Sequence, residues 1–212
     1  MKKQKQQSQQ DQREVWDALA EQWFHFRQRP FRDVSEELEN LSSSKPGKIL
    51  DIGCGSCRNL LPFAKKGFDC YGVDFSKEML RYAGEYSKKY GFRVKFKIGK
   101  AQKLPFKSIW FDYCLSIALL HHLKREEQKW AVKEMWRVLK PKGIALVAVW
   151  NKRFFSLFAK NRYEKWTKAG KAYYRYYYFF TPRELKRLLE LNGFEIVRQK
   201  IGKNIVMIAK KK

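Results

Sequence analysis

The chain has 212 residues, enough for one ordinary domain with a buried core. Its 46 Lys and Arg residues outnumber 21 Asp and Glu residues, which gives a formal net charge of +25. Solubility does not require so much positive charge, so the composition favours a nucleic acid partner, with an anionic membrane surface as the alternative. A lysine-rich surface like those of thermophile proteins is the other explanation, but more compensating acids would then be expected.

The first twelve residues are rich in Lys and Gln and contain no apolar segment, so they do not resemble a secretory signal. We expect residues 1–12 to form a disordered basic arm and residues 13–212 to form a single domain. No apolar run approaches the length of a membrane span, so we expect a cytoplasmic protein without a membrane partner. Cys54 and Cys57 form an isolated C-x-x-C, which we interpret as ordinary thiols rather than a metal or redox site.

Apolar periodicity and turn residues predict alternating helices and strands after this arm. Helices are expected at 13–23, 33–41, 59–66, 77–90, 125–139 and 182–191. Strands are expected at 48–54, 69–75, 93–98, 111–118, 143–150, 194–201 and 204–209, the last two as a terminal hairpin. Such alternation implies a mainly parallel sheet.

Residues 151–180 interrupt this alternation with an irregular segment rich in aromatic and basic side chains. Aromatic and cationic side chains are what a single-stranded RNA loop needs for stacking and phosphate contacts. Lys171, Arg175 and Tyr176 are therefore candidate RNA contacts. Aromatic rings also fill protein cores, and we expect about half of the rings at 173–179 to be buried.

Two acidic strand ends mark a candidate cofactor site. The strand before Asp51 runs into Gly53-Cys54-Gly55, and the next strand ends at Asp74, 21 residues after Gly53. Ligands of open α/β sheets bind beyond the carboxyl ends of the strands, where an acid can accept hydrogen bonds from a ribose. A dinucleotide fingerprint would need a third glycine, but that position is Arg58.

The Asp51-x-Gly53-x-Gly55 pattern resembles the first motif of class I S-adenosylmethionine-dependent methyltransferases. The resemblance implies a Rossmann-like α/β fold, with a seven-stranded, mostly parallel sheet, one antiparallel strand and helices on both faces. It also implies S-adenosylmethionine as cofactor, with Asp51 near the amino group, the glycines around the methionine part and Asp74 on the ribose. The cofactor-binding residues expected on this basis are Asp51, Gly53, Cys54, Gly55, Asp74, Phe75, Ala101, Gln102 and Ser116.

The segment Ser116–His122, which reads S-I-A-L-L-H-H, resembles the signature of the tRNA wobble-uridine carboxymethyl methyltransferases. Three weaker matches support it, at 27–31, 138–150 and 175–177. The resemblance implies transfer of a methyl group to the carboxylate of 5-carboxymethyluridine in the tRNA anticodon loop. It also implies a small zinc-binding activator subunit as a partner.

Two positions depart from this family. Lys100 replaces the acid that would read the adenine amino group, so adenine recognition is expected to use Ala101 and Gln102 instead. Lys142 stands where glycine is commoner, which we interpret as a neutral surface change.

A carboxylate acceptor is already ionised at neutral pH, so its methylation needs orientation and removal of water rather than a general base. The resemblance assigns Arg27 to the carboxylate or its uridine, and places His121 or His122 beside the reacting group. An arginine can bind a carboxylate with two hydrogen bonds, and a neutral histidine can donate another. The alternatives are a surface arginine and a histidine that only fills the loop.

The strand at 93–98 alternates basic and apolar residues and should form an edge of the sheet. An activator could add its own strand there, or the lysines could simply protect the edge. Two other functions remain possible: methylation of a small molecule, and RNA binding on a methyltransferase fold that has lost catalysis, which Lys100 suggests.

Overall fold

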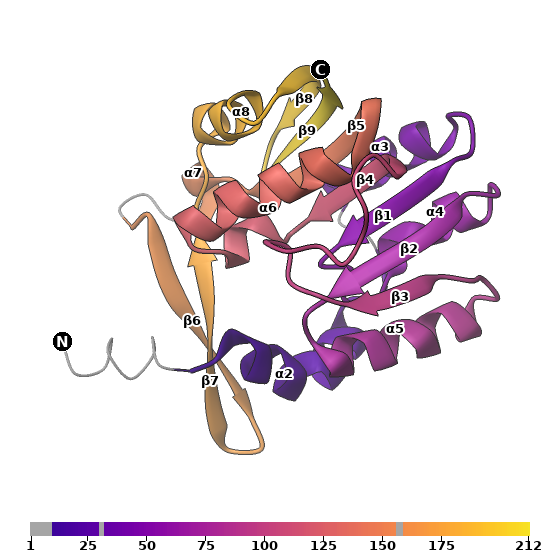
Figure 1. Ribbon diagram of the computed structural model, residues 1–212. Helices are drawn as coiled ribbons and strands as arrows, with labels where there is room; N and C mark the ends of the chain where they lie inside the picture. The colour runs from indigo at the N-terminus through magenta and orange to yellow at the C-terminus, as the bar shows by residue number, and fades with distance from the viewer. Residues whose placement is uncertain (1–9, 30–31, 156–158) are drawn as a thin grey trace.

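The computed structural model describes residues 10–29, 32–155 and 159–212 (Figure 1). A seven-stranded sheet has the order β3-β2-β1-β4-β5-β9-β8, in which β9 runs antiparallel to both of its neighbours. This confirms the predicted sheet with one antiparallel strand. Its strands are β1 (Lys48–Ile52), β2 (Asp69–Asp74), β3 (Lys95–Ile98), β4 (Phe111–Ile117), β5 (Leu139–Trp150), β8 (Phe194–Ile201) and β9 (Asn204–Lys211).

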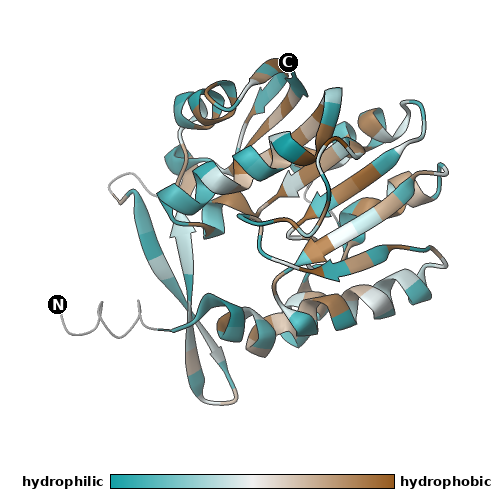
Figure 2. Ribbon diagram, viewed as in Figure 1, coloured by the Kyte–Doolittle hydropathy of each residue, from teal (hydrophilic) through white to brown (hydrophobic). Residues whose placement is uncertain are grey.

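Successive residues of a strand point to opposite faces of the sheet, so apolar residues on both faces need helices to cover them. Ile49 packs in one core cluster and Leu50 in the other. The first cluster is covered by α2, α3, α4 and α5, and the second by α6 and α8. These helices are α2 (Gln12–Phe26), α3 (Arg32–Ser42), α4 (Leu61–Ala64), α5 (Lys77–Lys89), α6 (Arg125–Val138) and α8 (Pro182–Glu190). Figure 2 shows the apolar residues concentrated in the central strands.

Two elements and one backbone conformation differ from the sequence prediction. The helix expected at 59–66 is a short 3-10 turn, Arg58–Leu60, followed by the single turn of α4. Strand β5 begins at Leu139 rather than at residue 143. Lys142, expected to be a neutral change, has a left-handed backbone with φ of 63°, a conformation that costs a residue with a side chain about 1 kcal/mol.

The segment at 151–180 is not irregular. It contains a short helix, α7 (Lys152–Phe155), and a β-hairpin formed by β6 (Asn161–Lys168) and β7 (Lys171–Tyr178). We expected about half of the six rings at 173–179 to be buried. Four of them are, the rings at 176–179. The hairpin is a separate two-stranded sheet that projects beside α2 in Figure 1 and is mainly polar in Figure 2.

The end of the predicted disordered arm is ordered where it meets this hairpin. Gln12 accepts a hydrogen bond from the Tyr176 N–H and donates one to the Tyr174 carbonyl. Gln10 repeats this pattern two residues earlier on β7: it accepts a hydrogen bond from the Tyr174 N–H and donates one to the Ala172 carbonyl. The two glutamine amides therefore pair with the edge of β7 as a neighbouring strand would. Residues 1–9 of the predicted arm lie outside the described residues.

Arg175 anchors the other side of β7 to α2. Its side chain is 6% exposed, and its guanidinium carbon lies 5.3 Å from the Trp23 ring centre and 4.7 Å from that of Trp166. Trp16 and Tyr177 complete the group of rings around it. Desolvated cation–π contacts stabilise such an arrangement by about 2 kcal/mol or more. Arg175 was expected to contact RNA phosphates, but this prediction is wrong, because the structure buries its side chain in a cage of rings.

We predict that Arg175→Ala lowers the free energy of unfolding by about 2 kcal/mol, because it removes the packing between α2 and β7. Lys171→Ala, an exposed position on the same strand, should change it by less than about 0.5 kcal/mol. Urea denaturation followed by tryptophan fluorescence measures both. Equal stability of the two variants would contradict the anchoring role.

Candidate functional site

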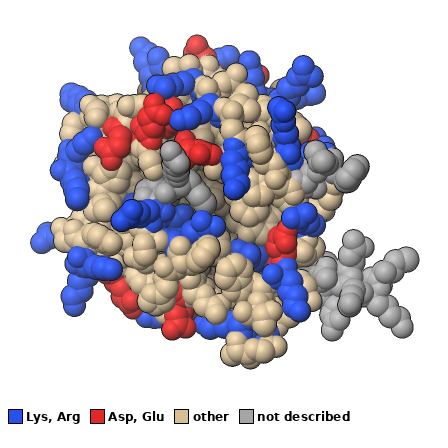
Figure 3. Space-filling view, turned by 180° about the vertical axis from the view of Figure 1, so that it is seen from behind, with Lys and Arg blue, Asp and Glu red and all other residues tan. Residues whose placement is uncertain are grey.

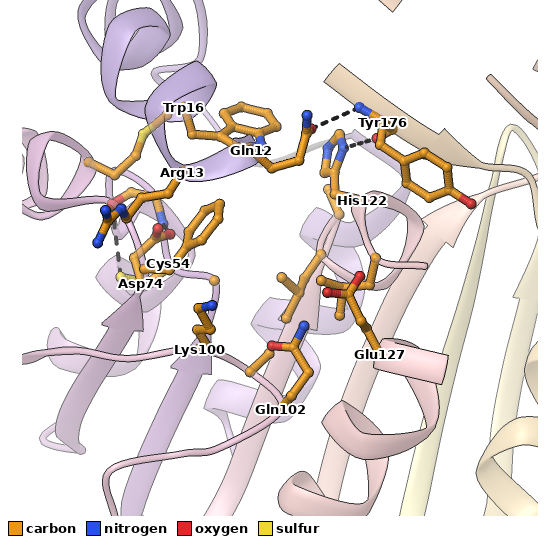
Figure 4. Close-up of a pocket in the computed structure, with 18 of the residues that line it drawn as sticks. Gln12, Arg13, Trp16, Cys54, Asp74, Lys100, Gln102, His122, Glu127 and Tyr176 are labelled. Atoms are coloured by element: carbon orange, nitrogen blue, oxygen red, sulfur yellow. Dashed lines mark hydrogen bonds between the residues drawn. The ribbon is translucent and has the colours of Figure 1, made fainter. Parts of the chain in front are cut away.

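A cavity of about 440 Å³ lies beyond the carboxyl ends of β1, β2, β3 and β4. Its walls come from the turn after β1, the start of α2, the segment between β4 and α6, and the β6–β7 hairpin. Figure 4 shows side chains from these elements pointing into a common space. This position is the ligand site of open α/β sheets.

The two glycines of the turn have different tasks. A side-chain Cβ on Gly53 would lie 2.8 Å from Leu119 Cδ1, so this glycine is required by packing. A Cβ on Gly55 would meet nothing within 4 Å, so the space beside it is open. Both have positive φ, a conformation that glycine adopts without strain. The turn therefore leaves a cradle that a ligand can enter at Gly55.

Asp74 lines the cavity next to this cradle. Its carboxylate accepts hydrogen bonds from the backbone N–H groups of Gly55 and Ser76, each at 3.0 Å. Burial raises its pKa to about 6, although these bonds oppose the shift. Each oxygen retains a lone pair, so the carboxylate can accept bonds from the vicinal hydroxyls of a ribose. Phe75, which follows it, also lines the cavity.

Asp51 and Ser116 lie beneath the cavity instead of lining it. Burial raises the pKa of Asp51 to about 7. Among the described residues its Oδ2 accepts a long hydrogen bond from Asn59 at 3.4 Å, while its Oδ1 and the Ser116 hydroxyl have no hydrogen-bond partner. An incompletely satisfied carboxylate below the cradle fits a cationic ammonium group, which would lower the cost of ionising it. These residues therefore fit the amino-acid part of the expected cofactor.

Ala101 and Gln102 line the end of the cavity nearest β3, together with Lys100. Figure 4 shows Lys100 and Gln102 along this side of the cavity. Cys54 lines it as well, and burial raises the pKa of its thiol well above the ordinary value, so it is a neutral thiol. Within the described ranges no His, Cys, Asp and Glu side chains gather into a metal-binding group.

The two histidines have different environments. His122 lines the cavity, and its Nδ1 lies 2.9 Å from the Tyr176 carbonyl oxygen (Figure 4). A carbonyl can only accept, so Nδ1 carries the proton and Nε2 is an acceptor. Burial lowers the pKa of His122 to about 3. His121 does not line the cavity; it is buried against Trp150 and Tyr177 and accepts the Trp150 N–H.

Three expected substrate residues do not line the cavity: Arg27, Lys171 and Arg175. Arg27 follows α2 and lies behind Trp23, with its guanidinium carbon 5.3 Å from that ring. Trp23 and Tyr176 do line the cavity. Arg175 instead contacts the rings of Trp16 and Trp23, which line the cavity.

Sequence reasoning missed several cavity residues: Arg13, Trp16, Lys124, Glu127 and Tyr163. Glu127 is the clearest case, because it lies in the first turn of α6 and its carboxylate accepts the Lys124 N–H at 2.8 Å. Figure 4 shows this carboxylate directed into the cavity below His122. An acid three residues after a helix start signals a capping box, which is why sequence alone suggests only a structural task.

We predict that affinity for S-adenosylhomocysteine falls as the pH decreases from 8 to 5. Asp51 and Asp74 have pKa values of about 7 and about 6, so both carboxylates become protonated and neutral across this range. A neutral carboxyl is a weaker acceptor and does not attract an ammonium group. Isothermal titration calorimetry at several pH values measures the effect.

Asp74→Asn should weaken binding about tenfold at pH 8, because a hydrogen bond to a charged group contributes about 1.5–3 kcal/mol. It should also remove the lower part of the pH dependence. Asp69→Asn, at the opposite end of β2, should leave affinity and pH dependence unchanged. An unaltered profile in Asp74→Asn would show that this carboxylate does not contact the ligand.

No helix among the described residues is long and apolar enough to cross a membrane. Residues 49–143 match a protein family described as "Methyltransferase domain". Among curated proteins, the chain is 32% identical over 141 residues to a tRNA (carboxymethyluridine(34)-5-O)-methyltransferase of Arabidopsis thaliana, covering 64% of this chain and 31% of that protein. It is 26% identical over 154 residues to a ubiquinone biosynthesis O-methyltransferase of Bartonella bacilliformis, covering 71% and 60%. The chain thus spans less than two thirds of either relative's length.

Solved structures show the same fold. A SAM-dependent methyltransferase of Methanosarcina mazei superposes with a TM-score of 0.70 and 25% identity, covering 86% of this chain and 98% of that one. A Haloferax volcanii methyltransferase, solved in complex with the Trm112 methyltransferase activator, superposes with a TM-score of 0.72 and 17% identity, covering 94% and 97%. The chain therefore has the class I methyltransferase fold, in which residues 49–143 match a methyltransferase domain, and S-adenosylmethionine is the cofactor that this fold indicates.

Proposed function

We propose that this protein methylates the carboxylate of 5-carboxymethyluridine at the wobble position of tRNA. The net charge of +25 supports a polyanionic substrate. Figure 3 shows Lys and Arg side chains spread widely over one face of the molecule, with the acidic side chains gathered in smaller patches. The similarity to the Arabidopsis thaliana tRNA methyltransferase supports the same substrate class, although it covers only part of that protein.

The observation that carries this proposal is the weak basicity of His122. S-Adenosylmethionine supplies an electrophilic methyl group when bound. A hydroxyl or ammonium acceptor must lose a proton to react, and a general base works best when its pKa is near the working pH. With a pKa of about 3, His122 is a poor base at neutral pH. A carboxylate acceptor avoids this difficulty because it is already ionised.

This geometry changes the task expected of the histidine. The Nδ1–H of His122 donates a hydrogen bond to the Tyr176 carbonyl. In this neutral tautomer Nε2 carries no hydrogen, so it cannot donate a hydrogen bond to a carboxylate. Nε2 can instead accept a hydrogen bond from an N–H or O–H of the nucleoside. Positive side chains that line the cavity, Arg13, Lys100 and Lys124, are candidates to orient the carboxylate. Arg27 is proposed to support the substrate site through Trp23.

A small activator subunit is proposed as a partner at the β3 edge. Strand β3 is the last strand on its side of the sheet, and Ile98 is 53% exposed there. Lys95 and Lys97 fold back, over the Tyr71 and Phe106 rings, so they leave part of the edge accessible. The Haloferax volcanii neighbour supports the idea, because it was solved with such an activator.

Methylation of a small amine or hydroxyl compound is the second candidate, and Glu127 is the observation that favours it. Its carboxylate points into the cavity, where it would attract an ammonium group and repel a carboxylate. The similarity to a ubiquinone biosynthesis O-methyltransferase also supports a small acceptor.

The main test is transfer of labelled methyl from S-adenosylmethionine to tRNA that contains 5-carboxymethyluridine, with an activator subunit present. We expect label that mild alkali releases, because a methyl ester hydrolyses and an N- or C-methyl group does not. Arg27→Ala should reduce the rate, and His122→Ala should reduce it further. Alkali-stable label would retain the tRNA substrate and reject the carboxylate. Binding of tRNA without transfer would favour a non-catalytic RNA-binding protein.

Glu127→Gln separates the two candidates. Glutamine keeps the hydrogen bond to the Lys124 N–H, since a capping box accepts either residue. If the acceptor is a carboxylate, we expect the variant to transfer methyl at least as fast as the unchanged protein. A loss of about 100-fold, about 2.7 kcal/mol of transition-state stabilisation, would instead support an amine or hydroxyl acceptor. Glu126→Gln, the exposed neighbouring acid, is the control.

A further inference from the structure

The β6–β7 hairpin has two faces of different character, and its register defines them. Residues directly opposite each other in an antiparallel pair lie on the same face. Trp166 pairs with Tyr173 and Lys168 with Lys171 on one face, here called the helix face. The second face, here called the cavity face, carries the cross-strand pairs Tyr163–Tyr176, Lys165–Tyr174 and Thr167–Ala172.

The helix face is occupied by α2. Trp166 donates a hydrogen bond to Gln22 at 2.7 Å, and the Lys168 ammonium donates to the Ala18 carbonyl at 2.9 Å. Arg175 reaches into the ring cage from this side. Lys171 lies on this face as well, and its ammonium sits over the Tyr173 ring. Most of the helix face is therefore already covered by this chain.

The cavity face begins in the substrate site and continues outwards. The Tyr163 and Tyr176 rings line the cavity and lie 5.4 Å apart. The next pair, Lys165 and Tyr174, lies two residues further along each strand, a step of about 7 Å. Lys165 is exposed and has no ion-pair partner within the described ranges. The Tyr174 ring is half-buried and stacks on no other ring there.

We propose that the cavity face, made of Tyr163, Lys165, Tyr174 and Tyr176, binds the single-stranded RNA that flanks the methylated nucleotide. This inference rests on the proposed tRNA substrate and names the surface that would hold it. Bases stack on accessible aromatic rings with a gain of about 1–3 kcal/mol each, and a lysine beside them contacts the backbone. A step of about 7 Å is roughly twice the rise of a stacked nucleotide strand, so the second pair reaches about two nucleotides beyond the one in the cavity.

The path of the N-terminal segment supports an RNA partner on this face. Gln10 and Gln12 are fixed to the edge of β7 by their paired amide bonds. Residues 1–9, which carry Lys2, Lys3 and Lys5, join the described chain at Gln10. The described part of the chain therefore begins beside β7, at the margin of the cavity face.

The test uses two matched double variants of the full chain. Lys165→Ala with Tyr174→Leu removes one lysine and one ring from the cavity face, and Lys171→Ala with Tyr173→Leu removes the same groups from the helix face. Fluorescence anisotropy with a labelled tRNA anticodon stem–loop measures affinity across a salt series. Thermal melting and S-adenosylhomocysteine affinity check that both variants are folded.

We expect the cavity-face variant to bind the stem–loop at least tenfold more weakly, with a salt dependence reduced by about one phosphate contact. The helix-face variant should lose less than about twofold. Equal losses, or a larger loss in the helix-face variant, would overturn the assignment. If the unchanged protein methylates the tRNA and both variants bind it normally, this surface is wrong while the proposed function stands. If the unchanged protein does not bind the stem–loop, both are wrong.

Discussion

The packing of β7 against α2 through Arg175 is the interaction on which the site depends. A guanidinium desolvated among Trp16, Trp23, Trp166 and Tyr177 holds the hairpin, which is not part of the main sheet, against the first helix. The same contact fixes one wall of the cavity, because Trp16 and Trp23 line it. Glu164 lies directly opposite Arg175 on β6, but no ion pair joins the two among the described residues, so ring faces are the main contacts of the guanidinium. The cross-strand pairs on the cavity face contain no acidic residue, so the hairpin adds no negative charge on that side.

Electrostatics divides the cavity into two halves. Near the glycine turn, the buried carboxylates of Asp51 and Asp74 are costly to ionise, and this cost is lowered by a ligand that carries an ammonium group and a ribose. At the other half, His122 is neutral and presents an acceptor, and Lys124 supplies positive charge, whereas Arg13 lies on the Asp74 side (Figure 4). A cofactor with a cationic amino-acid end and an acceptor that is already an anion fit these halves separately. Glu127 is the exception, since it adds negative charge to the second half.

Much of the fold could be predicted because the relevant signals are local. Alternating apolar strands, Ser76 as a helix cap and the capping box at Thr181 are all readable along the chain, and each is present in the structure. The short 3-10 turn at Arg58–Leu60 was missed because tertiary packing, not periodicity, determines it. The hairpin was missed because β7 carries consecutive tyrosines at 173–174 and 176–178, so its sequence lacks the apolar alternation of an ordinary half-buried strand.

The edge of the sheet that bears the cavity could be predicted from residue types at fixed spacing, namely the strand ends, Gly53, Gly55 and Asp74. Which side chains reach the cavity depends on how the elements pack together. His121 and His122 are adjacent in sequence, yet the turn after β4 sends one into the core and the other to the cavity. Likewise Arg175 and Tyr176 are neighbours on β7, and the two-residue period of a strand places them on opposite faces. The two-residue turn at Ala169 and Gly170, both with positive φ, fixes the register of the hairpin, and packing against α2 decides which of its faces turns towards the cavity.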